Sequence, residues 1–318
     1  MKIVVLDGYT LNPGDNPWDE LARLGELTVY ERTPADQSVA RAADAEIVLT
    51  NKTLLTATTL AHLPQLRFVA VLATGYNVVD VVAARARGIP VSNVPEYGTD
   101  SVAQHVFALL LELCHHVGMH DAAVQAGEWV QSVDFCFWKM PPLELSGLTM
   151  GIVGLGRIGR RVGTLAHAFG MNVLAAGGTR RDDPGYRPFV WTDIPQLFAR
   201  ADVISLHCPL MADNAGFVNR DLLGHVKSSA FFINVARGGL VDEAALADAL
   251  NAGQLAGAAV DVVSHEPMRA DNPLLGARNC VITPHIAWAS LAARRRLMAT
   301  TVRNVEAFIA GRPINVVN

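Results

Sequence analysis

The sequence predicts an α/β protein of two domains, each a parallel sheet with helices on both faces, and with a cleft between the domains. Short apolar segments alternate with segments of helical spacing, the order that folds into parallel sheets. A chain of 318 residues also exceeds the usual size of a single hydrophobic core. A second run of buried-type strands begins at Met150, after a long helical stretch and an irregular segment.

The first set of strands and helices lies within residues 1–97. The strand candidates are Ile3–Asp7, Leu27–Tyr30, Glu46–Thr50, Arg67–Leu72 and Pro90–Val94. The helical stretches between them include Trp18–Leu24, Leu54–Leu63 and Val78–Arg87. Thr74, Gly75 and Tyr76 directly follow one of these strands, where the free backbone N–H groups of a turn can hold a carboxylate. On local sequence alone, a plain turn before a helix is the favoured interpretation of this loop.

The break at residues 94–98, which holds a proline and a glycine, is a natural domain boundary. After it, Asp100 or Ser101 is expected to cap a helix that runs to about His120. The histidines near the end of this helix have no convergent carboxylate, so no metal site is predicted. Residues 127–147 are irregular and rich in aromatic side chains, which local packing, a partner subunit or an active-site edge would have to cover.

A glycine-rich turn follows the strand Met150–Val153 and precedes the helical stretch Arg160–Phe169. Its spacing is G-x-G-x-x-G, in the strand-to-helix context that gives this pattern its meaning. The glycines allow a tight turn, a close approach to a pyrophosphate and close packing of helix on strand, and the helix start faces the anion. The sequence therefore predicts a dinucleotide-binding Rossmann domain, with contacts from Gly154, Leu155, Gly156, Arg157, Ile158 and Gly159.

Polar residues follow the later strands of the second sheet. These strands are expected at Asn172–Ala176, Val203–His207, Phe231–Ala236, Ala258–Val263 and Cys280–Thr283. Ligands of open α/β sheets bind outside the carboxyl ends of the strands. Arg237, Glu266 and His285 all fall at such ends and are expected to converge on one crevice.

These three side chains suit hydride transfer between a nicotinamide and a carbonyl group. Arg237 offers a planar fork that matches a carboxylate, and His285 can pass a proton near neutral pH. Glu266, bonded to the ring, would favour the imidazolium form and hold its tautomer. Each has a plain alternative when taken singly, as a surface charge or a core histidine, but their common position beside a dinucleotide site favours catalysis.

The end of the second strand of this sheet bears on the choice of dinucleotide. An acidic residue that binds the ribose 2′-hydroxyl is expected about 20 residues beyond the first glycine. This chain has Gly177 there, and no carboxylate repels a 2′-phosphate. We therefore expect NADP(H) to be favoured over NAD(H), with contacts from Gly177, Thr179, Arg180 and Arg181, although the two arginines are open to a second interpretation as solvated loop charges.

The motifs together resemble the D-isomer-specific 2-hydroxyacid dehydrogenase family over essentially the whole chain. They are Gly151–Gly159, Leu206–Leu210, Asn234–Gly239, Asp261–Pro267 and Thr283–Ile286. The resemblance implies a substrate-binding domain of residues 1–97 plus 288–318, into which a dinucleotide-binding domain of residues 98–287 is inserted. It also implies a homodimer.

The resemblance assigns roles residue by residue. Arg237 matches the substrate-binding arginine, Glu266 the glutamate partner and His285 the acid/base histidine. Gly75 and Tyr76 match the loop that takes the substrate carboxylate, against the plain interpretation of that turn. Asp261 matches a cofactor-contacting aspartate, and the further cofactor contacts expected are Cys208, Pro209, Ala236 and His285.

Within the family, Thr74–Asn77, Tyr97–Gln104 and Asp134–Trp138 most resemble the glycerate dehydrogenase branch, which reduces hydroxypyruvate or glyoxylate. Trp138 is a hypothesis for an aromatic residue that reaches the partner's active site. The implied reaction reduces a small 2-oxo acid with NAD(P)H to a D-2-hydroxy acid. The alternatives are a dehydrogenase of another acid, such as phosphoglycerate, lactate or phenyllactate, and a non-catalytic dinucleotide sensor like the family's corepressors.

Bulk composition narrows the partners. A net charge of −4 without a basic stripe does not suggest nucleic acid binding. No apolar run approaches the ~18 residues that span a bilayer, so no membrane is expected. The four cysteines form no C-x-x-C pair, and the N-terminus reads as a strand rather than a signal peptide, so a cytoplasmic location is expected.

Overall fold

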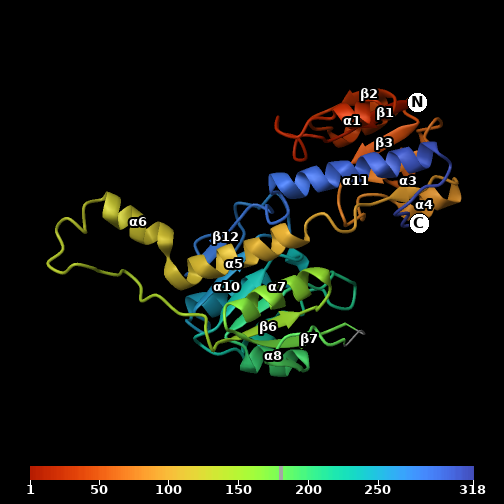
Figure 1. Ribbon diagram of the computed structural model, residues 1–318. Coiled ribbons are helices and arrows are strands. Elements are labelled where there is room, and N and C mark those ends of the chain that lie inside the picture. The colour runs from red at the N-terminus through yellow and green to blue at the C-terminus, as the bar shows by residue number, and fades with distance from the viewer. Residues whose placement is uncertain (179–181) are drawn as a thin grey trace. The chain divides into compact units, whose positions relative to one another are not determined.

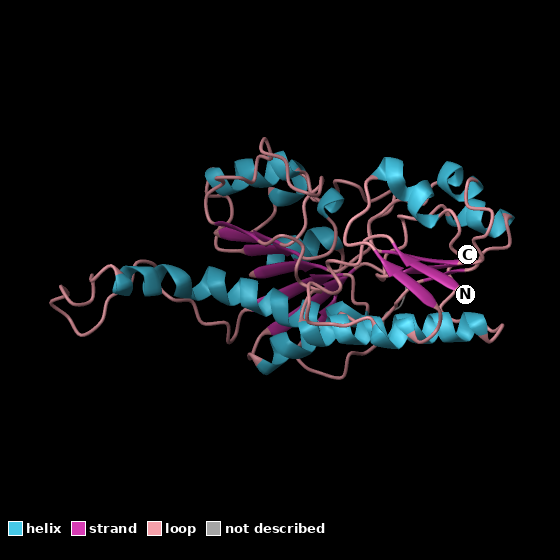
Figure 2. Cartoon of the chain, turned by 90° about the horizontal axis from the view of Figure 1, so that it is seen from above, coloured by secondary structure: helices cyan, strands magenta, loops and turns pink. Residues whose placement is uncertain are grey.

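The computed structural model describes residues 1–178 and 182–318 and divides into two compact units. Unit 1 comprises Met1–Gly98 and Trp288–Asn318, and unit 2 comprises Thr99–Ala287. Unit 1 holds a five-stranded sheet and unit 2 a seven-stranded sheet, and all paired strands in both are parallel (Figure 2). The prediction of two parallel α/β sheets is confirmed.

The sheet of unit 1 has the strand order β2-β1-β3-β4-β5. Its strands are β1 (Lys2–Val5), β2 (Glu26–Val29), β3 (Ile47–Thr50), β4 (Phe68–Val71) and β5 (Val91–Ser92). Alternate side chains enter two separate cores, with Val4 in one and Ile3 and Val5 in the other, because a strand has a period of two. The helical segments are α1 (Asp19–Ala22), the 3-10 turn η1 (Ala35–Gln37), α2 (Ser38–Ala42), α3 (Ala57–Ala61), α4 (Val81–Ala86) and α11 (Leu291–Ile309).

Helix α11 returns the end of the chain to unit 1 (Figure 1). The hydroxyl of Ser290 caps it by accepting from the N–H of Ala293. The ring of Phe308 stacks on Phe68 of β4 at 4.5 Å between centroids. This helix therefore completes one hydrophobic face of the first sheet.

The sheet of unit 2 has the order β12-β11-β10-β9-β6-β7-β8. Its strands are β6 (Thr149–Val153), β7 (Asn172–Ala176), β8 (Phe189–Trp191), β9 (Val203–Leu206), β10 (Phe231–Asn234), β11 (Gly257–Val260) and β12 (Cys280–Ile282). Six of these were predicted, and β8 was missed because three residues at a sheet edge carry too short a pattern. The helical segments of this unit are α5 (Thr99–His115), α6 (Val117–Gln125), α7 (Arg157–Ala168), α8 (Ile194–Arg200), α9 (Arg220–Leu223), η2 (Gly238–Leu240) and α10 (Glu243–Asn251). Helices α5 and α7 contact the sheet and each other, whereas α8 and α10 share a hydrophobic core with its strands.

The long helix predicted to run to His120 is broken. Helix α5 ends at His115, and His116 has a left-handed φ of +48° before α6 begins. Asp100 and Ser101 lie inside α5 rather than before it, so the capping prediction was wrong. Within the described part of the chain no single helix meets the length and hydropathy needed to cross a membrane, although α5 and α6, bent by 54°, meet them as a pair.

Candidate functional site

The glycine-rich turn lies where the strand order of the second sheet reverses. β6 and β9 are neighbours, and the chain leaves them in opposite directions along the sheet. Gly154 has φ +95°, and a Cβ there would lie 2.7 Å from the backbone nitrogen of Cys208, which follows β9. A Cβ on Gly159 would lie 2.3 Å from the Gly154 oxygen. Both positions therefore require glycine, as the motif predicts.

Helix α7 opens directly on this turn. It begins at Arg157, three residues before the predicted Arg160, because the last residues of the motif form its first turn. No side chain caps the helix at Gly156, and a Cβ on Gly156 would meet no atom within 4 Å. An uncapped N-terminus beside open space fits a dinucleotide pyrophosphate.

Two glycines follow β7, where the ribose of a dinucleotide is expected to lie. Gly177 has φ +80° and Gly178 has φ +79°, in the region that residues with side chains rarely adopt. Arg160 on α7 lies 3.6 Å from Asp182, just beyond them. The predicted contacts Thr179, Arg180 and Arg181 lie outside the described residues.

The structure brings Glu266 and His285 together. Nδ1 of His285 lies 2.7 Å from a carboxylate oxygen of Glu266, and both side chains are partly exposed (28% and 34%). The backbone N–H of Val263 lies 3.4 Å from the other carboxylate oxygen. The Nε2 edge of the imidazole is the one opposite the ion pair, which suits a group that exchanges a proton with a ligand.

Arg237 stands on a turn that a buried amide builds. The side chain of Asn234 accepts from the Ala236 N–H (3.0 Å) and donates to the Arg237 carbonyl (2.9 Å), whereas the Arg237 guanidinium is exposed. A Cβ on Gly238 would lie 1.9 Å from the Val263 backbone, so the turn packs directly against the segment after β11. The sequence analysis missed Asn234, although a lone amide at the end of an apolar strand was a signal.

A second acid fixes the loop that carries Glu266. The carboxylate of Glu243, at the start of α10, accepts from the N–H (2.6 Å) and the hydroxyl (2.8 Å) of Ser264. It also accepts from the side-chain amide of Asn272 at 2.9 Å. Nothing in the local sequence links Glu243 to Ser264, because the contact exists only once α10 has packed beside the loop.

Asp261 is 1% exposed, and its carboxylate is saturated by the segment around His285. One oxygen accepts from the Thr283 hydroxyl (2.6 Å) and the Ile286 N–H (2.9 Å), and the other accepts from the Ala287 N–H (2.9 Å). Burial alone would raise the pKa of Asp261, but hydrogen bonds from His105, Thr283 and the two backbone groups outweigh burial and lower it. These hydrogen bonds tie the carboxylate to the segment that carries His285.

His207 follows β9 beside the glycine turn. Its ring nitrogen Nε2 lies 2.9 Å from the Ser205 hydroxyl. The residue keeps a little accessible surface, but its ring is enclosed, and burial lowers its pKa from 6.5 to about 3. Burial also raises the pKa of the Cys208 thiol. This part of the turn is therefore neutral at pH 7.

We expect the enclosed His207 ring to make the fold acid-sensitive. Between pH 6.5 and about 3 the unfolded chain binds a proton at His207 that the folded chain does not. The free energy of unfolding therefore decreases as the pH is lowered, by up to about 1.4 kcal/mol per pH unit. The carboxylates of Asp261 and Asp15, whose pKa values are lowered, reduce the free energy of unfolding only as the pH falls through their ordinary pKa of 3.8. Urea unfolding of wild type and His207→Gln from pH 8 to 4 tests this. The difference between their free energies of unfolding should stay constant above pH 7 and shrink below pH 6. Free energies that fall in parallel over the whole range would contradict the assignment of the lowered pKa to His207.

Thr74, Gly75 and Tyr76 belong to unit 1, at the end of β4. The Thr74 hydroxyl donates to the Val94 carbonyl at 2.7 Å, and the Asn93 amide donates to the Thr74 carbonyl at 2.7 Å. These bonds fix the base of the turn, while the Tyr76 side chain is 40% exposed. The loop thus lies at the carboxyl edge of its own sheet.

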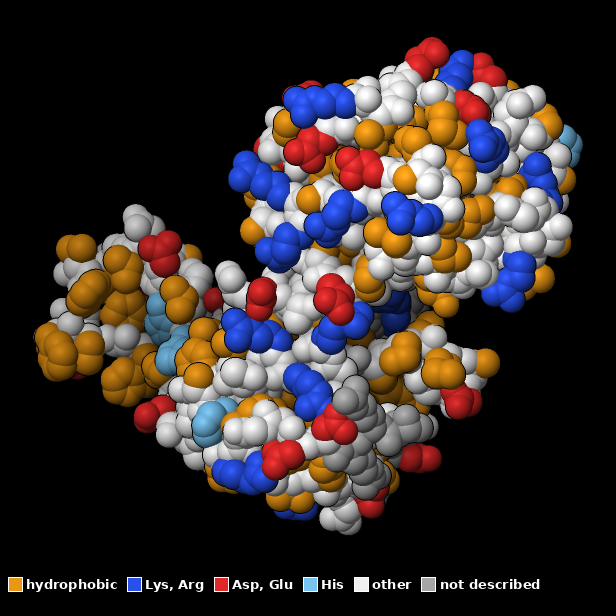
Figure 3. Space-filling view, turned by 45° about the vertical axis from the view of Figure 1, so that its right-hand side comes forward, with side chains coloured by type: hydrophobic (Ala, Val, Ile, Leu, Met, Phe, Trp, Pro, Cys, Tyr) orange, Lys and Arg blue, Asp and Glu red, His pale blue; other side chains and the backbone are white. Residues whose placement is uncertain are grey.

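Trp138 lies on an extended arm, residues 126–146. Together with α6 the arm projects away from the strands of unit 2 in both ribbon views (Figures 1 and 2). Trp138 is 62% exposed, and hydrophobic side chains gather over this region of the surface (Figure 3). The other exposed apolar residues of the arm are Trp129, Val130, Val133, Phe135, Met140 and Leu143.

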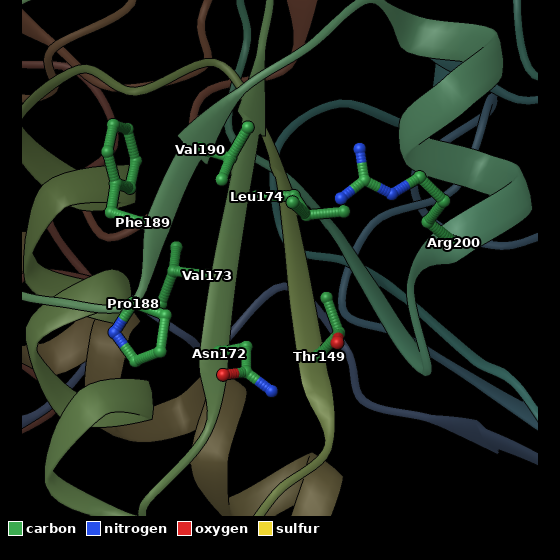
Figure 4. A pocket seen from close by; sticks show the side chains of 8 residues that line it. All are labelled: Thr149, Asn172, Val173, Leu174, Pro188, Phe189, Val190 and Arg200. Atoms are coloured by element: carbon green, nitrogen blue, oxygen red, sulfur yellow. The ribbon is translucent and has the colours of Figure 1, made fainter.

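The hollow shown in Figure 4 lies elsewhere. Its volume is about 280 Å³, and it is lined by Thr149, Asn172, Val173, Leu174, Pro188, Phe189, Val190 and Arg200. Thr149 and Asn172 are the first residues of β6 and β7, so the hollow opens at the amino ends of strands whose carboxyl ends carry the glycine turn. It therefore belongs to no part of the candidate site. The described residues also contain no group of three side chains suited to a metal ion.

Comparison with known proteins decides the family. The family model of the D-isomer-specific 2-hydroxyacid dehydrogenase NAD-binding domain matches residues 107–287. A hydroxypyruvate reductase of Blautia hydrogenotrophica is 50% identical over 321 residues and covers both chains completely. This chain belongs to the D-isomer-specific 2-hydroxyacid dehydrogenase family. The prediction made from its motifs is confirmed.

The relatives of this dehydrogenase also support its branch. The glycerate dehydrogenase of Methylorubrum extorquens is 40% identical and covers 99% of this chain and 98% of its own. A solved NADPH-dependent glyoxylate/hydroxypyruvate reductase of Sinorhizobium meliloti, in complex with NADP and malonate, is 31% identical. It superposes with a TM-score of 0.84 and covers 99% of this chain and 96% of that one. The chain is thus an NAD(P)-dependent dehydrogenase of the hydroxypyruvate reductase branch.

Proposed function

We propose that this dehydrogenase reduces hydroxypyruvate to D-glycerate and glyoxylate to glycolate, with His285 as the acid. The observation that carries the proposal is the 2.7 Å contact between Nδ1 of His285 and Glu266 at the carboxyl edge of the dinucleotide-binding sheet. A carboxylate on Nδ1 fixes the tautomer and the orientation of the ring. Nε2 then delivers the proton.

The residues divide the work as follows. The planar Arg237 fork binds the substrate carboxylate. Bound dinucleotide supplies the hydride that C2 of the substrate receives. His285 donates its Nε2 proton to the oxygen on C2, so the carbonyl becomes a hydroxyl and the ring becomes neutral. Glu266 keeps the neutral ring in place until solvent returns the proton.

The experiment is the loss of reduced-nicotinamide absorbance with a panel of acids. Hydroxypyruvate and glyoxylate should give the highest kcat/KM, ahead of pyruvate, phenylpyruvate and phosphohydroxypyruvate. Faster turnover of one of the latter would replace the substrate assignment. No turnover with any acid, together with retained dinucleotide binding, would favour a sensor like the family's corepressors.

We propose that NADPH is the preferred cofactor, because Gly177 replaces the acidic residue that binds a ribose 2′-hydroxyl. Gly177→Asp should lower kcat/KM for NADPH relative to NADH by about tenfold, since the new carboxylate repels the 2′-phosphate. Gly177→Asn is the matched control, because it pays the same backbone cost at φ +80° without the charge. A wild-type preference for NADH, or equal shifts in both variants, would refute the proposal.

We propose that the arm mediates a homodimer and that Trp138 reaches the partner's active site. The support is its row of exposed apolar side chains, which isolated soluble chains rarely leave uncovered. Trp138→Ala should raise the KM for hydroxypyruvate by about tenfold, and Trp129→Ala on the same arm is the control. Sedimentation should show a dimer for both. A monomeric wild type or unchanged Michaelis constants would contradict this.

A further inference from the structure

The segment Thr283–Ala287, which carries His285, is held by a helix far away in the sequence. The hydroxyl of Ser101 on α5 donates to the Ala287 carbonyl at 2.7 Å. One helical turn later, Nε2 of His105 lies 3.1 Å from the Thr283 hydroxyl. Residues i and i+4 share a helix face, so one face of α5 forms hydrogen bonds with both ends of the segment.

The hydrogen bonds at Thr283 have a defined direction. Its hydroxyl has one proton, which it donates to the Asp261 carboxylate at 2.6 Å. The same oxygen must therefore accept from Nε2–H of His105. Nε2 of His105 also lies 3.5 Å from that Asp261 oxygen, and the His105 side chain is only 19% exposed. His105, Thr283 and Asp261 form one polar chain from α5 to the strand ends.

This series of hydrogen bonds ends on the backbone around His285. Asp261 accepts from the N–H groups of Ile286 and Ala287, and its own carbonyl accepts from the His285 N–H at 2.8 Å. His285 has φ +55°, which residues other than glycine adopt rarely and which surrounding contacts must maintain. The direction of the His285 ring thus depends on contacts that the catalytic motif does not contain.

We propose that Ser101 and His105 are positioning residues, which hold the Thr283–Ala287 segment so that the His285 ring meets the substrate. The inference rests on the assignment of His285 as the acid. His105 itself does not touch the substrate. Its loss should slow proton transfer without weakening the binding of substrate or dinucleotide.

The test compares His105→Leu, His105→Gln and Ser101→Ala with wild type. His105→Leu should lower kcat for hydroxypyruvate by about 10- to 100-fold with KM and NADPH affinity unchanged, because a small displacement of a reacting group has an effect of this size. The solvent deuterium isotope effect on kcat should rise. His105→Gln, which keeps a donor at a similar reach, should recover most of the rate, and Ser101→Ala should give a smaller loss of the same kind.

Amide hydrogen exchange of residues 283–288 tests the positioning role of His105 independently of the role of His285 as the acid. Faster exchange in His105→Leu is expected from a released segment. Unchanged exchange, or a Gln variant as slow as the Leu variant, would overturn the positioning role whatever His285 does. Faster exchange with kcat unchanged would overturn it as well. If His285→Asn itself retained wild-type kcat, the proposed function would fail first.

Discussion

Replacing His285 with asparagine is expected to lower kcat for hydroxypyruvate reduction by about 10²- to 10⁴-fold, the usual contribution of a positioned acid. The loss should appear in kcat because the ring acts on the developing alkoxide rather than on the bound ground state. NADPH affinity, followed by fluorescence titration, should fall far less than kcat, since the glycine turn is untouched. Steady-state kinetics at pH 7 measures the effect.

Glu266→Gln is the companion variant for this prediction. The amide keeps a contact with Nδ1 but lacks the charge of the carboxylate, so the kcat loss should be smaller than for His285→Asn. The double variant should be no slower than His285→Asn alone, because Glu266 works through the ring. If the kcat loss of the double variant equalled the product of the two single-variant losses, Glu266 would have a role separate from His285.

Arg237→Gln is expected to lower kcat/KM for hydroxypyruvate by about 100-fold, mainly through KM. The change removes a charged fork worth roughly 3 kcal/mol in two carboxylate bonds. Arg237→Lys should recover only part of the affinity, because an ammonium group cannot make the bidentate contact. The backbone of the turn should survive, because the Asn234 side chain bridges it at two points, whereas the guanidinium contributes one bond, to the Ala236 carbonyl at 2.7 Å.

The control for Arg237 lies in the same unit. Arg220 is an exposed arginine that pairs with Asp248 at 2.5 Å. Arg220→Gln should leave kcat/KM unchanged, because exposed pairs of this kind contribute little. Equal losses in the Arg220 and Arg237 variants would indicate a general effect of net charge on substrate approach.

The sequence by itself determined the two parallel sheets, because buried strands and amphipathic helices carry strong periodic signals. It also identified the glycine turn, whose residues are restricted by backbone geometry at Gly154 and Gly159. The meeting of Glu266 and His285 followed from one topological rule, that parallel strands end at a common edge. These features are local, or follow from strand order.

Only the tertiary structure decided which side chains support that edge. Glu243 reaches Ser264, and His105 reaches Thr283, across 21 and 178 residues of sequence. Each looks like an ordinary helix residue until the helices dock on the sheet. The break at His116 likewise left no periodic signal, because the apolar spacing continues through it. Contacts between distant segments form when the core packs, and no local pattern encodes them.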